Sequence, residues 1–327
     1  MVDRAKKIFR LVFSHENAWL GSILVGLVVV LAVATKGLTI TRGNISNVLL
    51  HSANRGIAAI AQMFVILSGG VDVSLGGIAL LSAIVGSSVV TREPSLNIVG
   101  VPLPLAIGIV IMLAIGAGVG AVNGLFASHI RVPPLIGTLA MWQITKGFAF
   151  LICRGRTVFN LPRGLDFFGQ SYIGSVPVPV IIFAGIWVVG YFVLYHTVFG
   201  RSVYACGGNL VSAGLCGINT KKIQFSVYVI SGFLAALAGV IAVSRTMSAS
   251  MNTALGLELD SIAAVCIGGI SLMGGRGTPF GVILGVIILG VINNAMNVMA
   301  VNPAFVDITK GGLIMAAVAI DVWRRRH

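Results

Sequence analysis

The sequence predicts an all-α fold, a polytopic bundle of about ten transmembrane helices. Of its 327 residues, 57% are hydrophobic and only 9% are charged, and the mean hydropathy is +1.01. Soluble domains carry about 25% charged residues, so this chain cannot cover itself with a polar surface and lipid must be part of its solvent. A helix needs about 20 apolar residues to cross a bilayer, and several segments reach that length.

The expected spans follow one another along a single membrane domain, 1–327. They fall near residues 18–35, 54–68, 73–91, 101–128, 134–152, 177–197, 223–243, 260–274, 279–299 and 304–323. The first window follows a basic cytoplasmic segment, 1–17, and together they resemble a cleavable signal peptide. Because this apolar run is long enough to span and further spans follow it, we expect it to remain as the first span.

The basic residues are distributed as topology signals. The net charge is +13, and most of the lysines and arginines lie between spans or at the two ends of the chain. They are more numerous on the side that is cytoplasmic when both termini are inside, which is the orientation we expect. No basic face with interleaved aromatic residues appears, so contact with membrane lipid explains the charge better than a nucleic-acid partner does.

The sequence carries no signal for an enzyme. Its four cysteines form no C-x-x-C pair and the five histidines do not cluster near them, so we expect free thiols and no metal site. Neither a nucleophile paired with a base nor the glycine-rich phosphate loop of ATPases is found. No catalytic residue and no cofactor are therefore expected in this chain.

The stretch LSGGVDVSLGG places polar residues between two apolar runs. Gly69 and Gly70 allow a helix to break near residues 68–75. A charged group deep in a bilayer costs at least about 2.5–3.5 kcal/mol, so Asp72 needs a specific role. It can cap the next helix by accepting backbone N–H bonds, or it can lie with Ser74 along a water-filled solute path. The two roles are compatible, and we favour capping.

A second break is expected near residues 267–280, in the stretch CIGGISLMGGRGTPFG. Gly274, Gly275 and Gly277 interrupt the apolar pattern there. Two glycine-interrupted apolar segments, one in each half of a chain, indicate a transport pathway. Two ordinary tight turns would leave the same pattern, so that alternative stays open.

Amides inside the predicted spans are further candidates for the translocation pathway. Asn293, Asn294 and Asn297 lie in the ninth span, and Asn293 and Asn297 share one helix face because they are four residues apart. Asn123 in the fourth span is a weaker case of the same kind. Amides in lipid need partners, so these side chains should point into the bundle, where they either hold helices together or bind a polar solute.

Acidic residues are few, nine in all, and most lie near span ends. Glu258 and Asp260 precede the eighth span, where the positive end of a helix dipole favours them. Asp307 and Lys310, three residues apart, can form an ion pair within the membrane. A proton or ion relay would need more intramembrane carboxylates, so the sequence does not indicate ion-coupled transport.

The longest inner loop, 199–222, contains the signal for a short helix. Asn209 suits an N-cap, the following residues can form about two helical turns, and Gly217 suits the C-terminal stop. Such a helix on the cytoplasmic face can dock into the groove of a partner protein. A plain loop helix is the alternative.

Three stretches resemble the ribose/galactose-type permeases of ATP-binding-cassette (ABC) sugar importers: GGVDVSLGGIALLSA, GRSVYACGGNLVSAGLCGINTKKIQFSVYVISGFLAALAGVIAVSR and GLELDSIAAVCIGGISLMGGRGTPFGVILGVIILGVINNAMN. The resemblance covers nearly the whole chain and is most specific from Gly200 to Asn297. It implies the multi-pass membrane subunit of an importer in the bacterial inner membrane. It also implies a second permease subunit, a separate ATP-binding subunit that hydrolyses ATP, and an extracytoplasmic sugar-binding protein.

By the same resemblance, the segment from Asn209 to Gly217 is the coupling region that the ATP-binding subunit contacts. Its candidate residues are Asn209, Leu210, Ala213, Leu215 and Gly217. Leu210 and Cys216 depart from the family, whose members carry more polar or acidic residues after the asparagine and a serine before the Gly-Ile pair. The alternative function is an ATP-independent secondary transporter or channel for a small polar solute. The sequence leaves open whether the solute is a ribose-like pentose, a hexose, a furanose-like signal molecule or another polar solute. It also leaves open the identity of the ATP-binding subunit and whether the permease pair is a homodimer or a heterodimer.

Overall fold

The computed structural model describes residues 15–326, and most of this part is helical. The basic segment expected over residues 1–17 lies outside the described residues except for its last three. Within the described chain the only strands are β1 (Tyr172–Ile173) and β2 (Val176–Pro177), which form a short antiparallel hairpin. The predicted all-α helix bundle is therefore confirmed.

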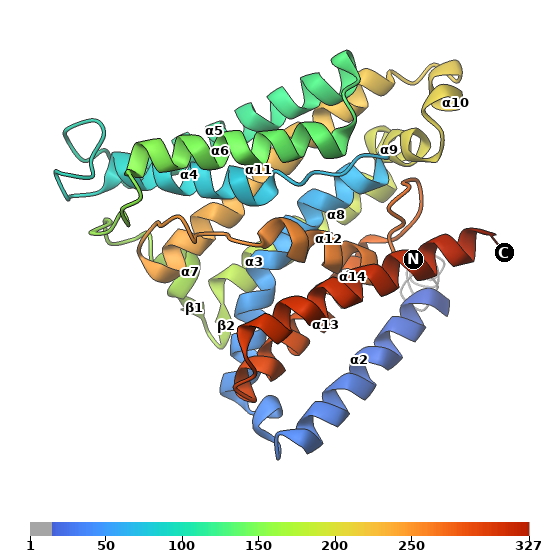
Figure 1. Ribbon diagram of the computed structural model, residues 1–327, viewed down its shortest axis with the longest axis horizontal. Helices are drawn as coiled ribbons and strands as arrows, with labels where there is room; N and C mark the ends of the chain where they lie inside the picture. Colours follow the sequence, from blue (N-terminus) through green and yellow to red (C-terminus); the bar gives the residue numbers. More distant parts are fainter. Residues whose placement is uncertain (1–14, 327) are drawn as a thin grey trace.

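Four helices pack side by side in one part of the bundle (Figure 1). They are α4 (Leu75–Val90), α5 (Leu105–Leu125), α6 (Pro134–Cys153) and α11 (Thr220–Thr246). The approach of α5 to α11 depends on glycine, because a Cβ on Gly116 or Gly120 would overlap the α11 backbone. Small residues thus allow these two backbones to touch directly, as is common between helices in membranes.

The other helices form a second group with α3 (Arg42–Leu67) (Figure 1). They are α2 (His15–Ala34), α8 (Val178–His196), α12 (Leu257–Ile267), α13 (Pro279–Val298) and α14 (Pro303–Arg326), and a 3-10 turn, η1 (Leu38–Ile40), links α2 to α3. α3 joins the two groups, since it packs on α11 as well as on α8, α12 and α13. Its second half is buried from Ile57 to Leu67 and belongs to the larger hydrophobic core.

Each of the ten predicted spans coincides with a helix, but not all have the expected length. Five helices in residues 15–326 are long and apolar enough to cross a membrane by length and composition: Leu105–Ile130, Pro134–Cys153, Val178–His196, Thr220–Thr246 and Pro279–Val298. The first of these continues α5 through a π-helical turn, η2 (Phe126–Ile130). α12 has 11 residues, so it is about 16 Å long. It is a half-helix, because the hydrocarbon core is about 30 Å thick. The eighth window was expected to be short and broken by glycine, and the helix ends at Ile267.

The two ends of the bundle carry different loops. At one end, α7 (Phe167–Gln170) lies against the end of α11, where the Gln170 amide donates to the carbonyls of Ser244 and Arg245 over 3.2 and 3.1 Å. The hairpin follows α7 and packs through β2 on α8 and α3. At the other end, α9 (Val198–Gly208) and α10 (Leu210–Leu215) connect α8 to α11. Figure 1 shows α10 projecting from a corner of the molecule.

Candidate functional site

The first helix break lies between α3 and α4, and Asp72 is at its centre. The Asp72 side chain is fully buried. Its Oδ1 accepts hydrogen bonds from the backbone N–H and the hydroxyl of Ser74, over 2.9 and 2.6 Å, and its Oδ2 accepts from the Ser231 hydroxyl of α11 over 2.9 Å. Asn123 of α5 donates to the Ser74 Oγ over 2.7 Å. Every oxygen of the carboxylate is thus satisfied by protein donors, as burial of such a group requires.

This geometry corrects the expected capping role of Asp72. The N-cap of α4 is Ser74, and Asp72 stands two residues earlier, where it braces the turn that leads into the helix. The structure brings together three of the predicted pathway residues, Asp72, Ser74 and Asn123. All three are buried, so the surrounding protein covers them in this conformation.

Side chains from other helices satisfy the backbone of the same break. The Val73 N–H donates to the Thr138 hydroxyl of α6 over 3.1 Å, and the Tyr228 hydroxyl of α11 donates to the Val71 carbonyl over 3.5 Å. The Gln62 amide of α3, oriented so that both of its groups are paired, bonds the backbone N–H and C=O of Asp72. Non-helical backbone at membrane depth is tolerated only where protein or water supplies such partners.

The second break, between α12 and α13, packs directly on the first. The Gly275 N–H donates to the Leu67 carbonyl at the end of α3 over 3.1 Å. A Cβ on Gly274 would lie only 2.8 Å from the Gly69 Cα, so a side chain there would push the two breaks apart. Gly69, Gly274 and Gly275 also have φ values of +89°, +85° and +72°, which favour glycine. These predicted helix-break residues therefore meet, although about 200 residues separate them in the sequence.

Helix α9 touches both breaks at once. A Cβ on Gly207 would overlap the Leu67 carbonyl, and a Cβ on Gly275 would lie 2.8 Å from the Gly208 Cα. The Tyr204 hydroxyl of α9 also donates to the Gly277 carbonyl over 3.0 Å. We define the breaks together with Gly207 as the glycine junction.

The predicted short helix of the inner loop is present as α10. The Asn209 side chain accepts from the Ser212 N–H over 2.9 Å as its N-cap, and the chain turns after the helix at Gly217, where φ is +82°. Val211 and Leu215 are 74% and 86% exposed, whereas Ala213 is buried against the protein. Leu210 is 41% exposed, so α10 presents three apolar side chains to its surroundings. This helix continues directly from α9, so a displacement of α10 reaches the glycine junction through one helix.

The asparagines of α13 do not join the glycine junction. Asn294 forms a reciprocal amide pair with Asn44 of α3, over 2.8 and 2.9 Å. Asn44 stands at the beginning of α3, whereas Asp72 follows its other end. Asn293 is buried with no hydrogen-bond partner for its Nδ2, and Asn297 is exposed. Asn294 therefore holds two helices together, and the six predicted pathway residues fall into two separate groups.

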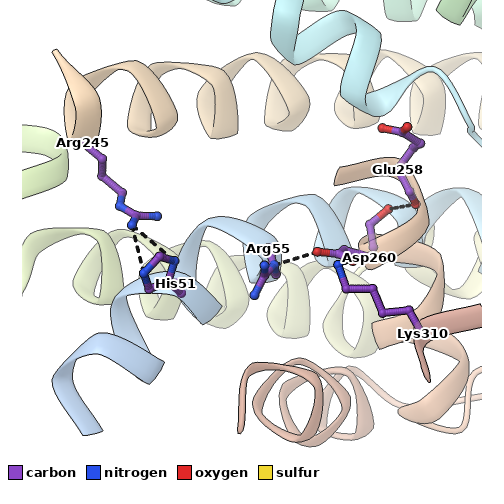
Figure 2. Close-up of polar contacts among 7 residues, drawn as sticks. His51, Arg55, Arg245, Glu258, Asp260 and Lys310 are labelled. Carbon is purple, nitrogen blue, oxygen red and sulfur yellow. Dashed lines mark hydrogen bonds and ion pairs between the residues drawn. The ribbon is translucent and has the colours of Figure 1, made fainter. Parts of the chain in front are cut away.

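A cluster of charges ties α12 to its neighbours (Figure 2). Asp260 pairs with Arg55 of α3 over 2.7 Å and with Lys310 of α14 over 2.9 Å. Lys310 therefore does not pair with Asp307 as the spacing suggested, and Asp307 is exposed. Nothing local in the sequence indicates the observed pairing, because each partner lies on a different helix.

Glu258, two residues before Asp260, connects α12 to the first break. Its carboxylate packs on Gly76 in the first turn of α4, where a side chain at position 76 would overlap it. The positive end of the α4 dipole favours an acidic group there. Both acidic residues at the start of α12 thus act between helices, in addition to the predicted interaction with their own helix dipole.

A bundle of membrane-spanning helices with two broken segments packed against each other has the architecture of a transport protein. The family described as the permease component of branched-chain amino acid transport systems matches residues 44–318. The chain belongs to this family of permease components, so it is a transporter subunit and not an enzyme, and it is a multi-pass protein of the bacterial inner membrane.

Relatives with sequence similarity over most of the chain are named as sugar permeases. The ribose import permease protein of Escherichia coli K12 is 35% identical over 97% of this chain and 96% of its own length. The L-arabinose ABC transporter permease protein of Azospirillum brasilense is 36% identical over 92% and 88%. The fructose import permease protein of Rhizobium meliloti is 36% identical over 83% and 75%. No solved structure matches the chain significantly.

Proposed function

We propose that this chain is the membrane-spanning permease of an ABC importer that translocates a sugar, a ribose-like pentose or a hexose, delivered by an extracytoplasmic binding protein. The proposed mechanism is based on the glycine junction, where α9 contacts both helix breaks and continues into the exposed helix α10. The similarity to ribose, L-arabinose and fructose permeases favours a sugar over the branched-chain amino acid in the family's description.

The proposed mechanism begins at α10. A separate ATP-binding subunit contacts its exposed apolar side chains, with Asn209 and Gly217 fixing the ends of the helix and Ala213 anchoring it to the permease. When that subunit closes on ATP, it displaces α10 and α9 together. Because Gly207 is packed on both breaks, the displacement shifts α3 and α4 relative to α12 and α13, and the path opens alternately to either side.

The buried polar residues of the first break take a positioning role in this mechanism. We infer that Asp72, Ser74 and Asn123 hold the break in one closed arrangement and do not themselves bind sugar. Asn294 holds α13 to α3. Asn293 and Asn297 remain the asparagines of α13 that are free to contact a solute in another conformation.

In the proposed assembly, two permease subunits lie side by side in the inner membrane. Helices α9 and α10 and the two chain termini are in the cytoplasm. The hairpin and α7 then lie on the outer face, where the binding protein delivers its cargo.

Uptake by the complete complex tests this proposal. The chain is reconstituted in liposomes with its ATP-binding subunit and its binding protein, and uptake of D-ribose, L-arabinose, D-fructose and L-leucine is measured with and without ATP. We expect ATP-dependent uptake of one of the sugars. Uptake of leucine alone would contradict the sugar assignment, and equal uptake without ATP would favour the alternative of a channel or secondary transporter.

A further inference from the structure

Helix α6 exposes a charged face within a membrane span. Only 17% of its apolar window is buried, the lowest share among the five long apolar helices of the described chain. Gln143 and Lys146 are both exposed, and their spacing of three residues places them on one side of the helix. An ammonium group facing lipid is strongly disfavoured, so this side of α6 needs a polar environment.

The conformation of Lys146 argues against an escape to the membrane surface. Its ammonium lies over the Trp142 ring, 4.9 Å from the ring centroid. Trp142 is one turn closer to the beginning of α6, whereas the nearer end, Cys153, lies about 10 Å away in the opposite direction. A snorkelling lysine would extend toward the nearer interface. Lys146 instead turns back toward the middle of the span, away from the nearer interface.

A hollow lies beside this lysine. A pocket of about 440 Å³ is lined by Gln143, Lys146, Gly147, Phe150, Leu151 and Met251. Gly147 contributes to the hollow because a Cβ there would meet nothing within 4 Å. The pocket therefore combines an amide and an ammonium with a flat aromatic ring, and these groups suit the hydroxyls and the apolar face of a sugar.

The same side of α6 adjoins the first break. A Cβ on Gly77 of α4 would lie 3.1 Å from the Trp142 ring, and Glu258 packs on the neighbouring Gly76. A rearrangement of the break would thus move the ring on which the Lys146 ammonium rests.

We propose that the face of α6 formed by Gln143, Lys146, Gly147 and Phe150 is a wall of the water-filled sugar path, open toward the second permease subunit. This inference rests on the proposed sugar import and names the residues that contact the cargo. The adjacent exposed position Phe148 is apolar and lies outside this pocket, so we expect it to face lipid.

Cysteine accessibility separates the two faces. Gln143→Cys and Gly147→Cys are made in a chain whose four native cysteines are replaced by serine, after that background is shown to import sugar. Phe148→Cys is the matched control. In the assembled complex, a charged methanethiosulfonate reagent should modify the first pair and block uptake, and an excess of the imported sugar should slow the modification. Equal modification of all three positions, or of none, would overturn the proposal.

A second pair of variants tests Lys146 without cysteine chemistry. Lys146→Met should raise the sugar concentration for half-maximal uptake about tenfold, the size expected for loss of one charged hydrogen bond. Lys146→Arg should restore it within about threefold, since it keeps the charge and the donors. Unchanged half-maximal concentrations in both would reject sugar contact, while the intact import by the native complex would leave the proposed function standing. If the native complex imported no sugar, the proposed function itself would fail.

Discussion

At the scale of single residues, the buried acidic groups act as joints between helices. Asp72 has no exposed surface and collects three hydrogen bonds from Ser74 and Ser231. Asp260 is paired with two cations from two other helices. Buried charges persist only where such partners offset the loss of water. Removing either carboxylate should therefore lower the stability of the fold more than it lowers the affinity for solute.

Asp72→Ala should lower the free energy of unfolding by at least about 2 kcal/mol, because the donors left behind lose their acceptor. Thermal unfolding in detergent and the yield of monodisperse protein measure the effect, and Asp307→Ala, at an exposed position, is the control. A normal yield combined with selectively lost transport would mean that Asp72 contacts the solute instead.

Asp260→Ala should destabilise the fold by about 3–5 kcal/mol, since it leaves Arg55 and Lys310 without their shared partner. Lys310→Met should cost less, because the pair between Arg55 and Asp260 remains. The same unfolding assay compares the two variants, and an equal or smaller effect of Asp260→Ala would show that its two ion pairs do not stabilise the fold.

At the scale of helices, the central feature is the contact of α9 with both breaks. Local patterns in the sequence predicted the spans, the two glycine breaks and the capped helix α10, because each depends on neighbours in the chain. They did not predict that Gly207 packs on Leu67 and Gly275 or that Asn44 pairs with Asn294, since these partners are far apart in sequence. The apolar window of the eighth span runs past Ile267 into the break, because apolar residues continue there, whereas α12 itself ends at Ile267.

Gly207→Ala should uncouple the complex, whereas Gly208→Ala should not. A methyl group at position 207 overlaps the Leu67 carbonyl, but one at position 208 meets nothing within 4 Å. Both positions lie in the last turn of α9, so they share the same helix propensity. We expect the ratio of sugar imported to ATP hydrolysed to fall at least about fivefold for Gly207→Ala, the lower end of typical coupling energies. Equal ratios for both variants would exclude the glycine junction as the route of coupling.

At the scale of the whole molecule, the reactivity of two cysteines can test the orientation of the chain in the membrane and the contact of α10 with the ATP-binding subunit. Cys216 is exposed at the end of α10, whereas Cys206 in α9 is buried, and burial raises the pKa of the Cys206 thiol. Because the thiolate is the reactive form, Cys206 should react slowly at neutral pH and faster as the pH rises.

A membrane-impermeant maleimide should therefore label Cys216 in inverted vesicles and not in right-side-out vesicles, and Cys216→Ser should remove this signal. Bound ATP-binding subunit should protect the thiol. Labelling from the outer face would place α10 and both termini on the opposite side of the membrane from the one proposed.

In the proposed mechanism, the permease is a gate that has no energy source of its own and is driven through α10 by a separate ATP-binding subunit. The most direct test is the sugar concentration reached inside vesicles that hold the permease alone or with that subunit, ATP and the binding protein. We predict accumulation above the external concentration only in the complete system. Accumulation against a gradient by the permease alone would contradict the account.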